Sequence, residues 1–236
     1  MRNLVFVFAA LAVAPACTSV ETAFVTANWT FHEIDEVNPA APPRVLPCPA
    51  GFDTAEVRLT SLTGGLDFID AYSCGAGTGT EAYDADLYDI ELIITNDAGQ
   101  VYAVSPSEGL TAVEIDTRDV DKTVNFSIAD NGGYFGYAWD LVDAATNAPL
   151  TCGQAGADSV EVVGTMVTNS NFALGDRYPC EDGAAVTPAF PAGEYTVSAA
   201  ALNTSDLALG EVQNKTTTMG DRNDFVNLGT VILPID

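Results

Sequence analysis

Short runs of alternating apolar and polar residues cover most of this chain, and segments rich in Gly, Pro, Asn and Asp separate them. In the two longest runs the apolar side chains occupy every second position, which places them on one face of a β-strand. These positions are Tyr88, Ile90, Leu92 and Ile94 in the first run and Tyr195, Val197, Ala199 and Ala201 in the second. No window shows sustained helical periodicity. The pattern therefore predicts an all-β protein.

The same order of features occurs twice, which indicates an internal duplication. Each half contains one tryptophan followed by two cysteines at similar spacing. These residues are Trp29, Cys48 and Cys74 in the first half, and Trp139, Cys152 and Cys180 in the second. In each half one more short strand is expected after the long run, at 100–104 and at 208–212. The halves also end alike, with Val124-Asn125-Phe126 and Val226-Asn227-Leu228.

Six or seven short strands in each half favour two tandem β-sandwich domains with an immunoglobulin-like arrangement. We expect the first domain to cover residues 24–130 and the second residues 131–236. A tight turn at Asp130-Asn131-Gly132-Gly133 would join them without a long linker. Each tryptophan is expected to pack over its cysteines in the core of its domain.

The N-terminus indicates export. Leu4 to Val13 is an apolar run too short to span a bilayer, so residues 1–16 read as a signal peptide. Ala14-Pro15-Ala16-Cys17 resembles a bacterial lipoprotein signal, in which the cysteine is lipidated. Residues 17–23 would then form the lipidated end and a short tether. Ala14 and Ala16 also fit ordinary secretory cleavage, but plain secretion would leave Cys17 as a spare thiol beside four pairable cysteines.

Export permits disulfide bonds, and four cysteines allow three pairings. If each half is a self-contained copy, the bonds join Cys48 to Cys74 and Cys152 to Cys180. A zinc site is the rival interpretation. It lacks a Cys-x-x-Cys spacing, and His32 is the chain's single histidine.

Charge narrows the range of partners. Without Arg2, which leaves with the signal peptide, seven basic residues face 33 acidic ones, a net charge of −26. Such a surface repels nucleic acid and anionic lipid headgroups. Hydrophobic residues make up 47% of the chain, enough for packed cores.

The segment Phe190-Pro191-Ala192-Gly193-Glu194-Tyr195-Thr196-Val197 resembles the turn and strand of carboxypeptidase-regulatory-like, Cna-B-like and transthyretin-like sandwiches. The resemblance implies a sandwich fold. Some members of that fold carry a Lys–Asn isopeptide bond, but the lysines here, Lys122 and Lys215, come late in their halves. The duplicated Trp–Cys–Cys order also resembles uncharacterised lipoproteins of myxobacteria and other delta-proteobacteria. That resemblance implies no known activity.

Catalytic and metal-binding chemistry have little support. A nucleophile–histidine pair needs a histidine, and His32 is expected in a loop or on a sheet surface. We therefore expect no enzyme activity and no cofactor. Two acidic clusters are candidate calcium ligands, because Ca²⁺ takes six to eight oxygens, although neither matches an EF-hand loop. Their members are Asp84, Asp86, Asp89, Asp116, Asp119 and Asp121. We expect these clusters to form a solvated acidic face, and calcium binding is the alternative.

These observations predict a non-enzymatic lipoprotein of the cell envelope, which we expect in the outer membrane. Its two disulfide-linked sandwiches would present a binding surface to a protein or glycan partner. The alternative is a structural or assembly component of the envelope or of a surface apparatus, without a ligand of its own.

The lipid anchor generates a first prediction. Intact-mass analysis of the membrane-extracted protein should show a chain that starts at Cys17 and carries added acyl mass. A soluble protein with an unmodified N-terminus would contradict the lipoprotein interpretation.

Overall fold

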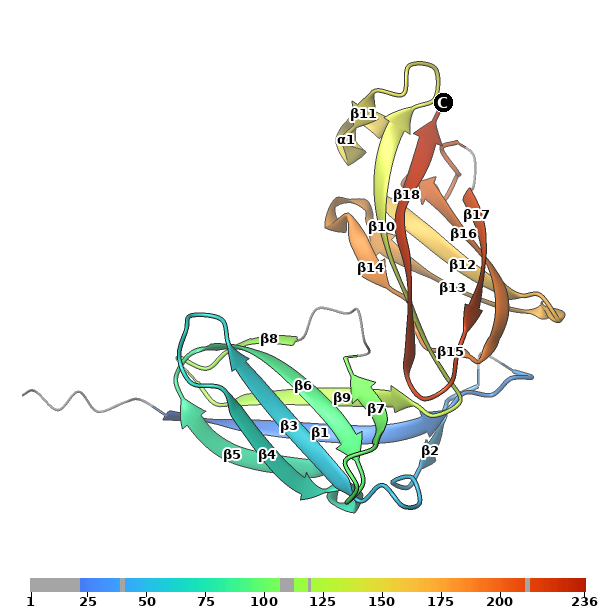
Figure 1. Ribbon diagram of the computed structural model, residues 1–236. Helices are drawn as coiled ribbons and strands as arrows, with labels where there is room; N and C mark the ends of the chain where they lie inside the picture. The colour runs from blue at the N-terminus through green and yellow to red at the C-terminus, as the bar shows by residue number, and fades with distance from the viewer. Residues whose placement is uncertain (1–21, 39–40, 107–112, 119, 211–212) are drawn as a thin grey trace, which may run out of the picture.

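The computed structural model describes residues 22–38, 41–106, 113–118, 120–210 and 213–236. It shows the predicted all-β chain, with four sheets that form two β-sandwiches. Figure 1 shows the sandwiches joined end to end, with the strands of the two running in different directions. We call them sandwich 1 and sandwich 2. The predicted signal peptide and Cys17 lie outside the described residues.

Sandwich 1 packs a sheet of order β2-β1-β5, in which β9 also pairs with β1, against a sheet of order β4-β3-β6-β7, in which β8 also pairs with β6. Its strands are β1 (Thr22–Glu33), β2 (Arg44–Leu46), β3 (Thr54–Ser61), β4 (Phe68–Ser73), β5 (Thr78–Asp84), β6 (Leu87–Thr95), β7 (Val101–Ser105), β8 (Val113–Asp116) and β9 (Lys122–Ala129).

Sandwich 2 repeats this plan. A sheet of order β11-β10-β14, in which β15 and β18 also pair with β10, packs against one of order β13-β12-β16-β17. The elements are β10 (Gly132–Asp143), β11 (Pro149–Leu150), α1 (Cys152–Ala155), β12 (Ser159–Met166), β13 (Asn169–Pro179), β14 (Ala184–Val186), β15 (Phe190–Pro191), β16 (Gly193–Leu202), β17 (Gln213–Met219) and β18 (Asp224–Ile235). Two 3₁₀ turns, Cys74–Ala76 and Cys180–Asp182, follow the second cysteine of each unit.

The alternating runs form the two cores, as predicted. Both runs lie in the central strands β6 and β16, and their inward residues are at most 5% exposed. Each sandwich has its own cluster of buried hydrophobic residues. None of the helices in the described part of the chain is long and apolar enough to cross a bilayer.

Each tryptophan is bonded to the second cysteine of its unit. The Trp29 indole N–H donates to the Cys74 carbonyl at 2.8 Å, and that of Trp139 donates to the Cys180 carbonyl at 2.9 Å. Both rings are at least 95% buried. Disulfides join Cys48 to Cys74 and Cys152 to Cys180, the pairing expected from the duplication. The indole ties the first strand of each unit to the turn at its second cysteine, and the disulfide ties the same turn to the segment before β3 or β12.

A buried tyrosine at the start of each central strand makes a second matching contact. The Tyr88 hydroxyl donates to the Asp84 carbonyl, and the Tyr195 hydroxyl donates to the Pro191 carbonyl, both at 2.8 Å. Burial raises the pKa of Tyr88 to about 12, with nearby carboxylates adding to the shift. The shared geometry makes Tyr88 and Tyr195 equivalent positions in the two units.

Two details of the predicted duplication are wrong. Ala208 forms only an isolated bridge with Leu202, and the strand expected at 208–212 is β17, which starts at Gln213. The two closing motifs are also not equivalent. Phe126 pairs with Trp29, whereas Val231, not Leu228, pairs with Trp139.

The two motifs already differ by two positions at their first residue, because Val124 pairs with Ala27 and Val226 with Phe135, and a β-bulge adds a third position. Leu228 and Gly229 together lie opposite Tyr137 on β10, so β18 carries one extra residue there. Gly229 has a φ of +70°, which glycine adopts without steric cost. The bulge moves the rest of β18 by one position relative to β9.

The buried tyrosines generate a second prediction. Tyr88→Phe and Tyr195→Phe should each lower the free energy of unfolding by about 1–2 kcal/mol, because each leaves a carbonyl without its partner. Tyr178→Phe is the control, since its hydrogen bond to the Val186 carbonyl is solvent-exposed, and should change stability by less than about 0.5 kcal/mol. Urea unfolding would measure the midpoints. Equal losses in all three variants would contradict the assigned role.

Candidate functional site

The two sandwiches meet at a short junction. The turn Asp130–Asn131 joins β9 to β10. The Asn131 side chain accepts a hydrogen bond from the Ile34 amide at 2.8 Å and donates one to the Ile34 carbonyl at 3.0 Å. The Asp130 amide donates to the His32 carbonyl at 2.9 Å. These bonds hold the turn against the end of β1.

A second turn of sandwich 2, just before β18, contacts sandwich 1 at the same junction. Asn223 is 3% exposed and has a φ of +64°, a conformation that Asn tolerates better than most residues. Its side chain accepts from the Ala129 amide at 3.0 Å and donates to the Val104 carbonyl at 2.7 Å. The Arg222 guanidinium lies 5.2 Å from the centre of the Tyr102 ring. Sandwich 2 is thereby bonded to β7 and β9 as well as through the chain.

Sandwich 2 also covers a groove on sandwich 1. The groove has a volume of about 220 Å³ and follows the seam where β9 faces β7 and β8. Five seam residues that line it are Ser105, Val113, Asn125, Phe126 and Ser127, and Pro106 lines it beside them. From sandwich 2, Tyr134, Val186, Thr187 and Asn223 line its other wall. The Tyr134 hydroxyl donates to the Ser127 carbonyl at 3.1 Å.

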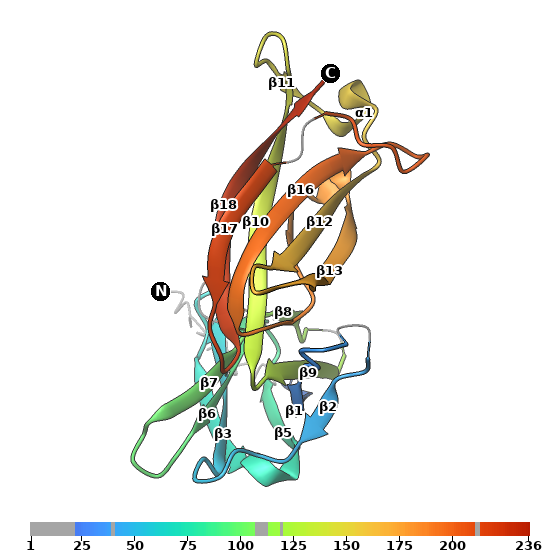
Figure 2. The same cartoon turned by 90° about the vertical axis from the view of Figure 1, so that its right-hand side faces the viewer.

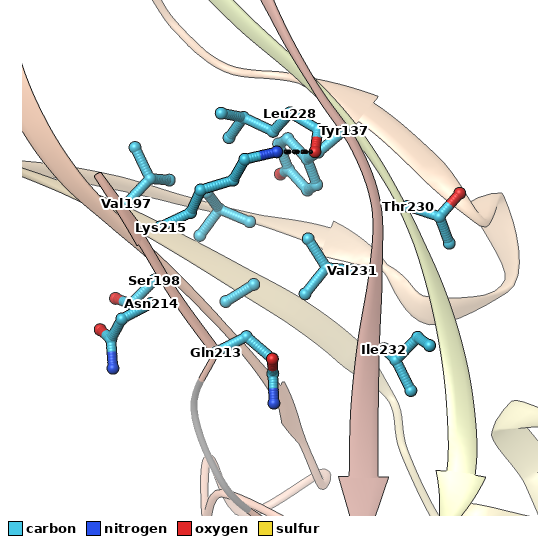
Figure 3. Close-up of a pocket in the computed structure, with 12 residues that line it drawn as sticks. Tyr137, Val197, Ser198, Gln213, Asn214, Lys215, Leu228, Thr230, Val231 and Ile232 are labelled. Atoms are coloured by element: carbon cyan, nitrogen blue, oxygen red, sulfur yellow. Dashed lines mark hydrogen bonds between the residues drawn. The ribbon is translucent and has the colours of Figure 1, made fainter. Parts of the chain in front are cut away.

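Strands β17 and β18 lie side by side in sandwich 2, as Figure 2 shows. A groove lies at this corresponding seam, and Figure 3 shows the side chains that line it. Its volume is about 310 Å³. Its rim residues are Gln213, Lys215, Thr230, Val231 and Ile232. Strand pairing makes these the counterparts of the five seam residues of sandwich 1, taken in the same order. All the described residues that line this groove belong to sandwich 2, so nothing from another sandwich covers it.

Lys215 is the charged group of this open groove. Its ammonium donates to the Leu228 carbonyl at 2.6 Å, as Figure 3 shows. No described carboxylate pairs with it, and none of the described lining residues is acidic. An ammonium has three donors, and among the described residues one acceptor, the Leu228 carbonyl, binds it. This is unusual in a chain with 33 acidic residues.

Tyr137 and two valines, Val162 and Val197, form the floor of the groove, and each is at most 4% exposed. Burial raises the pKa of Tyr137, with the neighbouring Tyr178 adding to the shift. The Tyr178 hydroxyl donates to Val186, and the Tyr137 hydroxyl has no hydrogen-bond partner within the described structure. The floor is therefore mainly apolar, with one buried hydroxyl, and the rim adds the polar side chains of Gln213, Lys215 and Thr230.

The predicted calcium ligands do not come together as a described site. Asp86 is held inside sandwich 1 by hydrogen bonds from the Ser61 and Thr63 hydroxyls, which keep the pKa of its carboxyl below the usual value. The Arg118 side chain binds Asp116 and lowers the pKa of that carboxyl as well.

The remaining candidates are Asp84, Asp89, Asp119 and Asp121. Asp121 accepts a hydrogen bond from the Phe24 amide at 2.9 Å, and Asp119 lies outside the described residues. In the part of the chain that the structure describes, no three His, Cys, Asp or Glu side chains are placed to hold a metal ion. A solvated acidic face stays the prediction, with calcium binding as its alternative.

The sequence predicted a loop or sheet-surface position for His32, but the structure places this residue in the interior. It lies in β1, is 9% exposed, and contacts the Ser127 hydroxyl through Nδ1 at 3.1 Å. Burial lowers its pKa and favours the neutral ring. Its place at the junction makes it a packing residue.

Sequence reasoning missed both seams. Their residues are polar or mixed and lie on strands that meet only in the fold, so no local motif marks them. The usable signal was the duplication itself, once Trp29 and Trp139 are taken as equivalent positions.

No family model matches this chain, and no curated protein sequence matches it. Among solved structures, it is similar to a leucine-rich repeat protein from Bacteroides thetaiotaomicron at 15% identity, with a TM-score of 0.38. That match covers 91% of this chain and 26% of the other, so this chain spans about a quarter of its length. A minor pilin from Streptococcus agalactiae matches at 14% identity over 91% and 96% of the two chains, with a TM-score of 0.29. A streptococcal ancillary pilin matches at 14% identity over 91% and 62%, with a TM-score of 0.25.

The junction generates a third prediction. Asn131→Ala combined with Asn223→Gly removes four side-chain hydrogen bonds, and glycine keeps the positive φ at position 223. The two sandwiches should then reorient independently, whereas in the unchanged protein both should fit one alignment tensor in residual dipolar couplings. Asn96→Ala, in the turn between β6 and β7, is the control. Independent reorientation of the unchanged protein would contradict a fixed junction.

Proposed function

We propose that this chain is a non-enzymatic binding module of the cell envelope, and that sandwich 2 carries its binding surface for a protein or glycan partner. One observation carries the proposal. The seam that sandwich 2 covers on sandwich 1 exists again on sandwich 2, where no described residue of another domain covers it. A repeated surface that forms an interface in sandwich 1 and is exposed in sandwich 2 is suited to binding a partner.

A protein fits this surface better than a glycan. Sugar recognition commonly uses an exposed aromatic ring, and Phe24 is the one aromatic residue among the described large hydrophobic side chains that are exposed. Phe24 lies in sandwich 1. The open groove offers instead an apolar floor, a lysine and exposed strand edges, which suit a polypeptide.

The cellular setting agrees with this role. Two disulfides suit an oxidising compartment outside the cytoplasm. Lipidation of Cys17 would attach the chain through the segment that precedes sandwich 1. The outer membrane as the site of attachment is part of the proposal.

The alternative is a structural or assembly component without a ligand of its own. The junction favours it, because side-chain and backbone hydrogen bonds from Asn131 and Asn223 hold the sandwiches together. A fixed pair of sandwiches serves equally well to space other envelope parts.

Site-specific photo-crosslinking in intact cells generates a fourth prediction. A crosslinking residue at Ile232, which is 55% exposed on the rim of the open groove, should trap one defined partner. The same residue at Ile69, 65% exposed on the edge strand β4 of sandwich 1, is the matched control and should trap none. Absence of adducts at Ile232, or the same adducts at both positions, would remove the support for a binding surface on sandwich 2.

A further inference from the structure

The contact between the two sandwiches is a pattern that the chain can repeat with another copy of itself. Within one chain, the seam of sandwich 1 receives the end of sandwich 2 that carries Tyr134, Val186 and Thr187. Sandwich 1 has a corresponding end, which we call its base, with Phe24 and Glu81 at the counterpart positions. We propose that the open seam of sandwich 2 binds the base of sandwich 1 in a second copy of this chain. The inference rests on the proposed function and names the partner.

The counterparts are defined by the strand register. Phe24 stands five residues before Trp29, and Tyr134 stands five residues before Trp139. Glu81 is paired with Val25 on β1. The Thr187 amide donates to the carbonyl of Phe135, the counterpart of Val25, and the Thr187 hydroxyl accepts from the Phe135 amide. Tyr134 and Thr187 therefore have defined equivalents in sandwich 1, namely Phe24 and Glu81.

The first pair of equivalents is apolar on both sides. At the junction, the Tyr134 hydroxyl binds the carbonyl of Ser127. The corresponding residues in the contact between copies are Phe24 and Ile232. Phe24 is 54% exposed and Ile232 is 55% exposed. A polar contact inside the chain thus becomes an apolar contact between chains, and it would bury two large side chains that one copy leaves in water.

The second pair of equivalents is oppositely charged. Val113 and Thr187 line the covered groove of sandwich 1 from its two walls. Their counterparts are Lys215, on the open seam, and Glu81, an exposed residue at the base. Lys215 has no carboxylate partner among the described residues. A carboxylate supplied by a second copy would complete its hydrogen bonding.

Another part of the junction differs between the two units. Arg222 lies over the Tyr102 ring, whereas Arg118, which precedes β9 as Arg222 precedes β18, binds Asp116. Copies also lack the covalent connection through Asp130–Asn131. Each exported copy carries a net charge of −26, so copies repel one another at low ionic strength. The association is therefore weaker than the internal contact, and added salt strengthens it by screening.

The contact is heterologous, because a seam meets a base rather than another seam. Each copy offers one of each, so the contact does not close on itself and can continue head to tail into a chain of copies. Repeat proteins stack in the same way, because each repeat buries the exposed face of its neighbour.

Analytical ultracentrifugation tests self-association. The probe is the exported chain with Cys17→Ser, which removes the predicted lipid site. It should associate reversibly, more strongly at 0.5 M than at about 0.05 M NaCl. Phe24→Ser and Lys215→Glu should each weaken association by about tenfold or more. Lys215→Glu combined with Glu81→Lys should restore it. Ile69→Ser, an exposed isoleucine away from both surfaces, and Arg44→Glu, which makes the same change in net charge as Lys215→Glu, are the controls.

Mixing two variants tests the direction of the contact. Phe24→Ser damages the base and keeps the seam, whereas Lys215→Glu damages the seam and keeps the base. Each alone should be monomeric under conditions in which the unchanged chain associates, and their mixture should form 1:1 dimers and nothing longer. Three results would overturn the inference. The unchanged chain could stay monomeric at all salt concentrations, the control variants could weaken association as much as the test variants, or the mixture could fail to dimerise. If Ile232 nevertheless crosslinks a different protein in cells, the proposed function stands and only the identity of the partner is wrong.

Discussion

The parallel pairing of the last strand of each unit with its first strand is the constraint on which the rest of the structure depends. β9 runs parallel to β1 and β18 runs parallel to β10. Among the described strands, neither β9 nor β18 pairs on its other edge. Sandwich 1 is therefore open along the seam between β9 and the strands β7 and β8. Sandwich 2 is open along the seam between β18 and β17. An open edge is a place where other chains add, so a stable protein must cover or use it.

The seam is covered in sandwich 1 and exposed in sandwich 2. In sandwich 1, Asn223 and Tyr134 from sandwich 2 bond to β7 and β9 across it. In sandwich 2, the seam exposes Ile232 and places Lys215 beside a carbonyl of the bulged strand. An inward-facing lysine on an edge strand also discourages indiscriminate strand pairing. The groove is thus protected against general aggregation and remains available to a matching surface.

Local patterning in the sequence was enough to predict the core strands and the two units. Alternation identified the central strands around Tyr88 and Tyr195, and the Trp–Cys–Cys order identified two units with their own disulfides. Prediction failed where the pattern is weak. β17 reads Gln213-Asn214-Lys215-Thr216-Thr217-Thr218-Met219, which has no apolar alternation. The similar motifs at 124–126 and 226–228 occupy different register positions, and the extra residue in β18 adds to the difference, so they misaligned β18 with β9. The junction could not be found either, because Asn131 and Asn223 act through backbone groups far away in the sequence.

An electron cryomicroscopy structure of the associated chain at high salt is the most direct test of the idea that each seam is a docking place for the next sandwich. The rotation and translation that carry sandwich 1 onto sandwich 2 within one chain should also carry sandwich 2 onto sandwich 1 of the next copy. Phe24 should then lie against Ile232. A two-fold contact between identical surfaces, or a head-to-tail contact through other faces, would contradict the account.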